Sequence, residues 1–133
     1  FNPVLHEARA MVARGDLGPP RLISGGYLQD WLLEETDWNW RALSASNGTL
    51  RAMGDIGSHW MDMIQHVTGL SITAINADLK IFHKTRKKPK FAVETFTGKT
   101  LNPDDYEQIQ IDTEDFGSVL LHLGDRAVRH PQG

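Results

Sequence analysis

The sequence predicts a mixed α+β domain. Two segments, one near the N-terminus and one at residues 55–67, repeat apolar residues with the period of an α-helix. Residues 72–81 alternate apolar and polar side chains, which is typical of a strand with one buried face. The second half of the chain contains further strand patterns. At 133 residues, the chain is long enough for one domain with its own core.

The first helix is expected to begin at Asn2 and Pro3, because Asn is a favoured N-cap and Pro is favoured at the first helical position. Gly15 follows the last apolar residue of the pattern and is a typical helix stop. The apolar stripe of this helix consists of Val4, Leu5, Ala8, Met11 and Val12.

Residues 21–31 have a strand pattern that two consecutive glycines weaken. Residues 32–54 have no clean period, and we expect a long loop with a helical turn. A long loop inside a compact domain is usually functional or disordered, and the tryptophans here argue against disorder. Their clustering fits either a pocket wall or a core packed under an irregular loop. The four tryptophans are Trp31, Trp38, Trp40 and Trp60.

The helix predicted at 55–67 has two different faces. At about 100° per residue, one face is apolar, and the neighbouring face carries Asp55, His59, Asp62 and His66. Carboxylates one turn from imidazoles can orient a tautomer, accept a proton or hold a metal. The same residues also fit a simple N-cap at Asp55 and solvated histidines without a catalytic role. The apolar face consists of Ile56, Trp60, Met63, Ile64 and Val67.

The rest of the chain is expected to be rich in strands. In the strand at 72–81, Ile75, Ala77, Leu79 and Ile81 would form the buried face. Two later strands are expected to be joined by Glu114 and Asp115. The further expected elements are a loop-like segment at 84–106 with a short strand at 91–96 and a turn at 102–105, strands at 107–113 and 116–123, a hairpin turn at 124–125 and a returning strand at 126–128.

Charge and composition argue against several classes of protein. The formal net charge is −3, and the one basic cluster, at residues 84–90, is short, so no nucleic-acid partner is expected. No stretch is long enough to span a membrane. The absence of cysteine removes disulfides and thiolate metal sites, and it fits a cytoplasmic protein. There is no Gly-x-Gly-x-x-Gly fingerprint for a dinucleotide. Because the chain starts at Phe1, we expect it to be part of a longer protein.

The run from Gly54 to Asp62, which closes on Thr68-Gly69, resembles a family signature. It is similar to the Asp-x-Gly-x-His-x-x-Asp motif of the glucose–fructose oxidoreductase, inositol dehydrogenase and rhizopine-catabolism (Gfo/Idh/MocA) family. The resemblance extends over nearly the whole chain. The other similar segments are the helix and turn at 3–18, the strand at 26–31, the Trp-Asn-Trp-Arg run at 38–41 and the Thr-Glu-Asp-Phe run at 113–116 with its continuation at 119–121.

This resemblance implies an open, mostly antiparallel sheet with helices on one face, as in the C-terminal domain of the family. Residues 1–133 would be a partial substrate and oligomerisation domain, without the N-terminal Rossmann domain, the Glu-Lys-Pro segment or the later strands of the sheet. NAD or NADP would be bound mainly by the absent domain. We therefore expect the isolated chain to bind the cofactor poorly and to be inactive.

The resemblance also implies roles for individual residues. His59 matches the acid/base that takes the proton of the substrate hydroxyl, and Asp55 matches the residue that hydrogen-bonds the substrate and tunes that histidine. Arg41, Trp40 and Asp62 are the candidate substrate-binding residues, with Asp62 expected behind the direct contacts. The implied substrate is a sugar, a polyol or a related hydroxyl or carbonyl compound. The implied assembly is a homodimer or larger homo-oligomer through the sheet.

Two other classes of function stay open at this point. One is a divalent-metal hydrolase or lyase module that uses Asp55, His59, Asp62 and His66. A single helical face rarely encloses a metal without ligands from a second element, and we expect no metal site. The other is a non-catalytic domain whose sheet serves assembly. Metal analysis of the purified protein separates the first of these from the rest.

Overall fold

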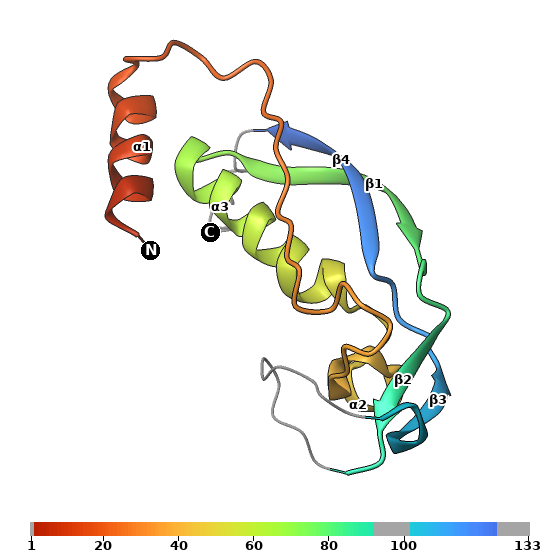
Figure 1. The fold of residues 1–133 in the computed structure, drawn as a ribbon. Helices are drawn as coiled ribbons and strands as arrows, with labels where there is room; N and C mark the ends of the chain where they lie inside the picture. The colour runs from red at the N-terminus through yellow and green to blue at the C-terminus, as the bar shows by residue number, and fades with distance from the viewer. Residues whose placement is uncertain (1, 92–101, 125–133) are drawn as a thin grey trace, which may run out of the picture. The chain divides into compact units, whose positions relative to one another are not determined.

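A computed structural model describes residues 2–91 and 102–124. The chain divides into two compact units (Figure 1). Unit 1 comprises the described residues of Phe1–Gly26, Ser58–Asp78 and Ser118–Gly133, and unit 2 comprises those of Tyr27–Gly57 and Leu79–Gly117. Both units mix helical and extended segments, so the predicted α+β class is confirmed.

Helix α1 of unit 1, Pro3–Arg14, begins and ends where the sequence predicts. The side chain of Asn2 accepts a hydrogen bond from the backbone N–H of Val4 at 3.0 Å, as an N-cap does. Gly15 ends the helix with φ of 78°, in the left-handed region that favours glycine. The local signals at both ends therefore set the bounds of α1.

Helix α3, Ser58–Thr68, packs against α1 and also lies beside the strand pair β1–β4 (Figure 1). Strands β1, Ser71–Lys80, and β4, Phe116–Gly124, form a two-stranded sheet and run in opposite directions. Ile64 is the buried residue of α3. The helix predicted at 55–67 is confirmed as an α-helix from Ser58 onward. The strand predicted at 72–81 is confirmed to within one residue at each end.

The buried face predicted for β1 is wrong. Ile75 is 55% exposed, and Ala77 and Leu79 are exposed as well. An alternating pattern records which face of a strand is apolar, but burial requires a surface that covers this face. The strand predicted at 21–31 is also wrong, because these residues form no strand. An extended segment becomes a strand only where a neighbouring strand accepts and donates its hydrogen bonds.

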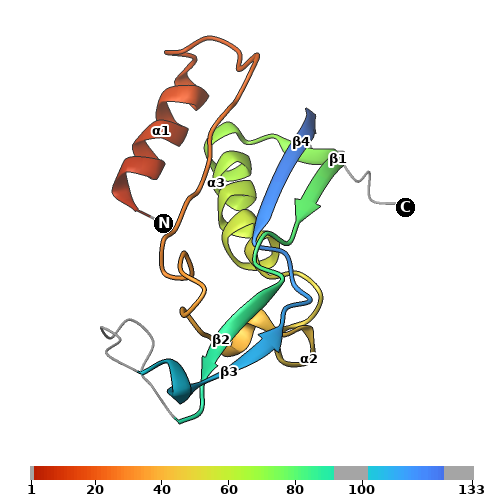
Figure 2. The same cartoon turned by 45° about the vertical axis from the view of Figure 1, so that its right-hand side comes forward.

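Unit 2 contains a hairpin-like strand pair that the sequence did not predict in full. Strand β2, Thr85–Pro89, pairs antiparallel with β3, Tyr106–Gln110, from Thr85 opposite Gln110 to Pro89 opposite Tyr106 (Figure 2). The basic sequence of β2 suggested a solvated loop. Strand β3 ends at Gln110, three residues before the predicted end, and it pairs with β2 while β4 pairs with β1.

The remaining described segments of unit 2 are mostly irregular and contain four short helical turns, in agreement with the predicted long loop with a helical turn at 32–54. They are the 3₁₀ turn η1 at Trp40–Ala42, helix α2 at Ser44–Asn47, the π-helical turn η2 at Met53–Gly57 and the 3₁₀ turn η3 at Pro103–Asp105. The last of these occupies the turn predicted at 102–105. The strand predicted at 91–96 falls almost wholly outside the described residues, and so do the predicted returning strand at 126–128 and part of the hairpin turn at 124–125.

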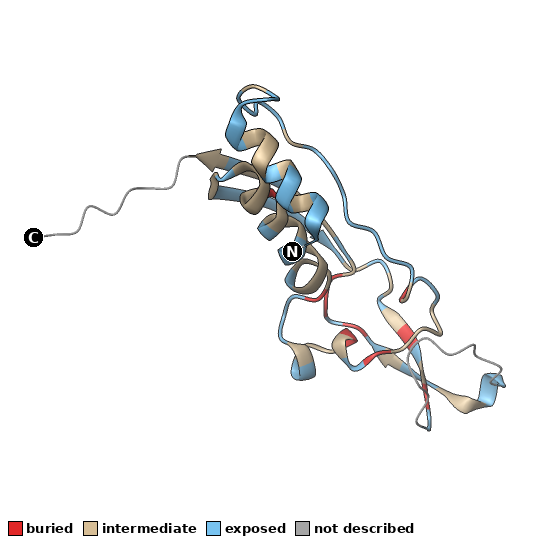
Figure 3. Ribbon diagram, turned by 90° about the vertical axis from the view of Figure 1, so that its left-hand side faces the viewer, coloured by how far each residue is buried: buried red, intermediate tan, exposed pale blue. Residues whose placement is uncertain are grey.

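Most of the buried residues in the described part of the chain belong to unit 2, and in unit 1 only Ile64 is buried (Figure 3). Several of them are polar or charged, which is unusual for a core and requires hydrogen-bond partners. Within residues 2–91 and 102–124, no helix is both long and apolar enough to cross a membrane. The buried polar residues are Asn39, Arg51, Arg86, Thr113 and Glu114.

Candidate functional site

The turn η1 presents two of the candidate substrate-binding residues, Trp40 and Arg41. The side-chain oxygen of Asn39 accepts hydrogen bonds from the backbone N–H of Arg41 at 3.1 Å and from its Nη1 at 3.5 Å. The guanidinium carbon of Arg41 lies 4.5 Å from the centroid of the Trp40 ring, which is a cation–π contact. Trp40 is 50% exposed. Unit 2 therefore offers an accessible indole with a stacked guanidinium beside it.

Asp55 lies in the π-helical turn η2, directly before α3 in the sequence. Its backbone N–H donates to the carbonyl of Arg51 at 2.9 Å, and the residue is half-buried. A Cβ at Gly57 would approach the Cε of Met53 to 2.6 Å, so the turn is closely packed at this position. Single π-helical turns often occur at functional sites, since they redirect side chains within a helix.

His59 and Asp62 lie on α3 in unit 1, and both are exposed. Asp55, Trp40 and Arg41 belong to unit 2. The structure therefore brings Trp40 and Arg41 together within one unit, and it places His59 and Asp62 on one helix of the other unit.

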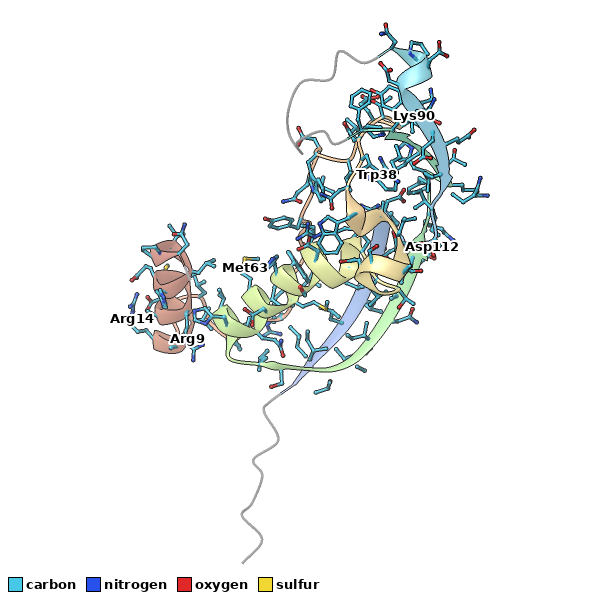
Figure 4. The ribbon with its side chains drawn as sticks, turned by 90° about the horizontal axis from the view of Figure 1, so that it is seen from below. Arg9, Arg14, Trp38, Met63, Lys90 and Asp112 are labelled. Atoms are coloured by element: carbon cyan, nitrogen blue, oxygen red, sulfur yellow. The ribbon has the colours of Figure 1, made fainter. Side chains whose placement is uncertain are left out.

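His66, the last residue of the predicted polar face, contacts α1. Nη1 of Arg9 donates to the backbone carbonyl of His66 at 2.7 Å and lies 3.5 Å from its Nδ1 (Figure 4). The ring of His6 packs edge-on against it at 5.3 Å between centroids. Burial lowers the pKa of His66 below 6.5, and the charges of Arg9 and His6 lower it further against the opposing charge of Asp62. His66 therefore acts in the packing of α1 on α3.

Two residues hold these loops in place: Glu114, which the sequence assigned to a strand connection, and Thr113, which it assigned to the end of the strand predicted at 107–113. Glu114 is buried, and its two carboxylate oxygens accept hydrogen bonds from the backbone N–H groups of Arg51 and Met53, both at 2.7 Å. The hydroxyl of Thr113, also buried, donates to the carbonyl of Ala42 at 3.0 Å. The available signal was the run of four consecutive polar residues at 112–115, at the junction of the two predicted strands.

The neighbouring acids make similar contacts to the backbone. The carboxylate of Asp112 accepts from the backbone N–H of Ser44 at 2.9 Å and from its hydroxyl, and these hydrogen bonds lower the pKa of Asp112 (Figure 4). Asp115 accepts from the backbone N–H groups of Phe82 and His83 at 2.8 and 2.9 Å. The segment 112–115 therefore anchors three other segments of unit 2.

Arg51 is a buried cation close to these acids. Its Nε and Nη2 are buried without a hydrogen-bond partner in the described part of the chain. Burial lowers the pKa of Arg51, and the negative charges of Asp115 and Glu114 oppose this effect.

No three His, Asp, Glu or Cys side chains of residues 2–91 and 102–124 are grouped so that they could hold a metal ion. The metal-dependent alternative therefore has no ligand set in this part of the chain, since a protein zinc site needs at least three ligands.

Comparison with known proteins places the chain in a family. Residues 5–130 match the GFO/IDH/MocA C-terminal domain. The fold is similar to a crystal structure of an oxidoreductase domain protein from Kribbella flavida, with a TM-score of 0.71 and 28% sequence identity. The match covers 91% of this chain and 30% of that chain. A search of curated proteins found no match. Because the family match spans nearly all of its residues, the chain belongs to the Gfo/Idh/MocA family of NAD(P)-dependent oxidoreductases and corresponds to their C-terminal domain.

Proposed function

We propose that this chain is the substrate-binding domain of an NAD(P)-dependent oxidoreductase that acts on a sugar, a polyol or a related compound. NAD or NADP is held mainly by a dinucleotide-binding domain outside this chain. The observation that carries the proposal is the helical fold of the signature run, which leaves His59 exposed on α3 within a chain that matches the family from residue 5 to 130.

In the proposed reaction, hydride leaves a carbinol carbon of the substrate for the nicotinamide, and the proton of the same hydroxyl passes to His59. By the family resemblance, Asp55 takes the role of hydrogen-bonding the substrate and tuning the acid/base histidine. Asp62 takes an indirect role in substrate binding.

Trp40 and Arg41 support the choice of a sugar or polyol. An exposed indole face packs against the C–H groups of a sugar ring or polyol chain, and a guanidinium donates several hydrogen bonds to its oxygens. The 4.5 Å cation–π contact and the hydrogen bonds to Asn39 hold Arg41 in a defined position. A residue held in this way loses little conformational entropy when it binds a ligand.

We also propose that the protein assembles into a homodimer or larger homo-oligomer. Ile75 on β1 and Leu120 on β4 are 55% and 66% exposed. Exposed apolar surface on a sheet tends to be buried against a partner, and two-fold dimers are the commonest solution.

The proposed roles are tested by replacing His59 and Asp55 in the full-length protein that carries this chain. His59→Ala should lower hydride-transfer turnover by on the order of 10²–10⁴, the usual contribution of one positioned acid/base. Asp55→Asn should lower turnover less and shift the pH profile, since the imidazole loses a negatively charged neighbour. Steady-state and single-turnover rates from pH 5 to 10 measure both effects.

His122→Ala is the matched control, because His122 is an exposed histidine on β4 outside the candidate site. It should keep wild-type kinetics. Wild-type turnover in both His59→Ala and Asp55→Asn would contradict the proposed roles and favour a non-catalytic assembly domain.

A further inference from the structure

We propose that Glu114 and Thr113 are positioning residues for the reaction. Glu114 sets the position of Asp55, and Thr113 sets the position of Trp40 and Arg41. The inference rests on the proposed function, because it assumes that these three residues meet the substrate. All five residues belong to unit 2, so each of the contacts involved lies within one compact unit.

Glu114 reaches Asp55 through the backbone of Arg51. One carboxylate oxygen of Glu114 accepts the N–H of Arg51 and the other accepts the N–H of Met53, both at 2.7 Å. The backbone carbonyl of Glu114 also lies 3.4 Å from the N–H of Ala52. The carbonyl of Arg51 in turn accepts the N–H of Asp55 at 2.9 Å. One buried residue therefore holds Arg51, Ala52 and Met53, the last of which is the first residue of η2.

A carboxylate is the group that this geometry requires. Two backbone donors converge on one side chain, and an ionised carboxyl group presents an acceptor oxygen to each of them. Glutamine has one carbonyl oxygen and one NH₂ group, so one of the two backbone N–H groups would face another donor. Because Glu114 is only 5% exposed, water cannot readily replace the lost bond.

The charge of Glu114 has a second effect on the same loop. The guanidinium of Arg51 is buried beside it, with Nε and Nη2 unpaired among the described residues. Burial lowers the pKa of Arg51, and the negative charges of Asp115 and then Glu114 oppose this effect and favour the charged guanidinium.

Thr113 acts on the turn η1. Its hydroxyl donates to the carbonyl of Ala42 at 3.0 Å, and both residues are fully buried. The N–H of Ala42 donates to the carbonyl of Asn39 at 3.1 Å, which closes the turn that carries Trp40 and Arg41. The carbonyl of Ala42, at the end of η1, is thus fixed to Thr113, the neighbour of Glu114. The short connection between β3 and β4 therefore positions both η1, which carries Trp40 and Arg41, and the turn that carries Asp55.

The test compares variants of the full-length enzyme by steady-state kinetics over a range of pH. Glu114→Gln should lower kcat by on the order of 10–10², the effect of a misplacement of about 1 Å at a reacting group. It should shift the pH profile in the same direction as Asp55→Asn, and the double variant should show no further shift. A merely structural role would lower the melting temperature and leave the pH profile unchanged.

Thr113→Val, which keeps the shape and removes the hydroxyl, should raise KM and leave the pH profile as in the wild type. Thr113→Ser, which keeps the hydroxyl, should restore KM. Glu107→Gln is the matched control for Glu114, because Glu107 is an exposed acid on β3 that pairs with Lys88 at 2.9 Å. This variant should behave like the wild type.

A folded Glu114→Gln variant with wild-type kcat and pH profile would overturn the inference for Glu114, and an unchanged KM in Thr113→Val would overturn it for Thr113. If Glu114→Gln does not fold, Glu114→Asp keeps the charge but is one methylene shorter, so its oxygens cannot reach both N–H groups without moving the loop, and a wild-type kcat and pH profile in that variant overturns the inference instead. The catalytic variants distinguish a failure of the proposed function from a failure of the positioning role. Wild-type turnover in both His59→Ala and Asp55→Asn removes the proposed function, whereas low turnover in these variants with an unaffected Glu114 variant removes only the positioning role.

Discussion

Arg86 anchors the loop before η1 to strand β2. Its Nη1 donates to the carbonyls of Glu34 and Asp37 at 2.9 and 3.2 Å, and its Nη2 donates to the carbonyl of Leu32 at 2.8 Å. The residue is 1% exposed, and burial lowers its pKa. Loops have few backbone partners of their own, so one planar guanidinium that pairs with three carbonyls supplies what a strand neighbour would otherwise supply.

We predict that Arg86→Met lowers the free energy of unfolding by about 2–4 kcal/mol, because three backbone carbonyls lose a buried, charged donor. Urea unfolding measures the loss. Lys87→Met is the control, since Lys87 is exposed on the same strand and its ion pair with Glu35 should contribute less than about 1 kcal/mol. Equal stability of the wild type and Arg86→Met would mean that the loop is held by other contacts.

The candidate catalytic residues illustrate what one-turn spacing predicts and what it misses. The spacing of Asp55 and His59 correctly predicted a helical segment that carries both. It did not predict that Asp55 occupies a π-helical turn, nor that the backbone at Arg51 and Met53 donates to Glu114, more than fifty residues away in the sequence. The roles of the two residues stay a prediction.

The sequence predicted both helices α1 and α3, and their packing gives His66 a property that neither helical pattern predicted. Where they meet, Arg9 and His6 of α1 surround His66 of α3. A lowered pKa means that the folded protein binds a proton at His66 less readily than the unfolded chain does. The stability that this histidine contributes is therefore complete above about pH 6.5 and is lost as the pH falls through its lower folded value.

We predict that the wild-type protein loses more stability between pH 7.5 and pH 5 than His66→Gln does. Protonation of His66 places a third positive group beside Arg9 and His6, and glutamine does not titrate. Thermal unfolding at several pH values measures the difference. His122→Gln should keep the wild-type pH dependence, and an identical slope for His66→Gln and the wild type would contradict the prediction.

At the scale of the whole molecule, the described chain leaves apolar side chains exposed on both strands of the β1–β4 sheet. Ile75 and Leu120 are the examples in unit 1, although the alternation of β1 predicted a buried face. Exposed apolar surface on a sheet tends to be buried against a partner, which is the basis of the proposed assembly.

We predict that the protein self-associates at micromolar concentration and that Leu120→Lys weakens this association. A charge in an apolar contact must be desolvated, which favours the monomer. Sedimentation velocity of the wild type and the variant measures the change. Val4→Lys is the control, because Val4 is exposed on α1 away from the strands, and a monomeric wild type would show that this apolar surface is not an interface.

The sequence by itself determined the features that depend on near neighbours. The cap at Asn2, the stop at Gly15, the period of α3 and the alternation of β1 involve interactions within a few residues, and the family motifs can be read in the same way. Only the tertiary structure decided which strands pair, that the basic strand β2 is the partner of β3, and that Glu114 holds the loop before Asp55. These outcomes depend on contacts between residues far apart in the chain, where the free energy of burial and pairing outweighs local preference.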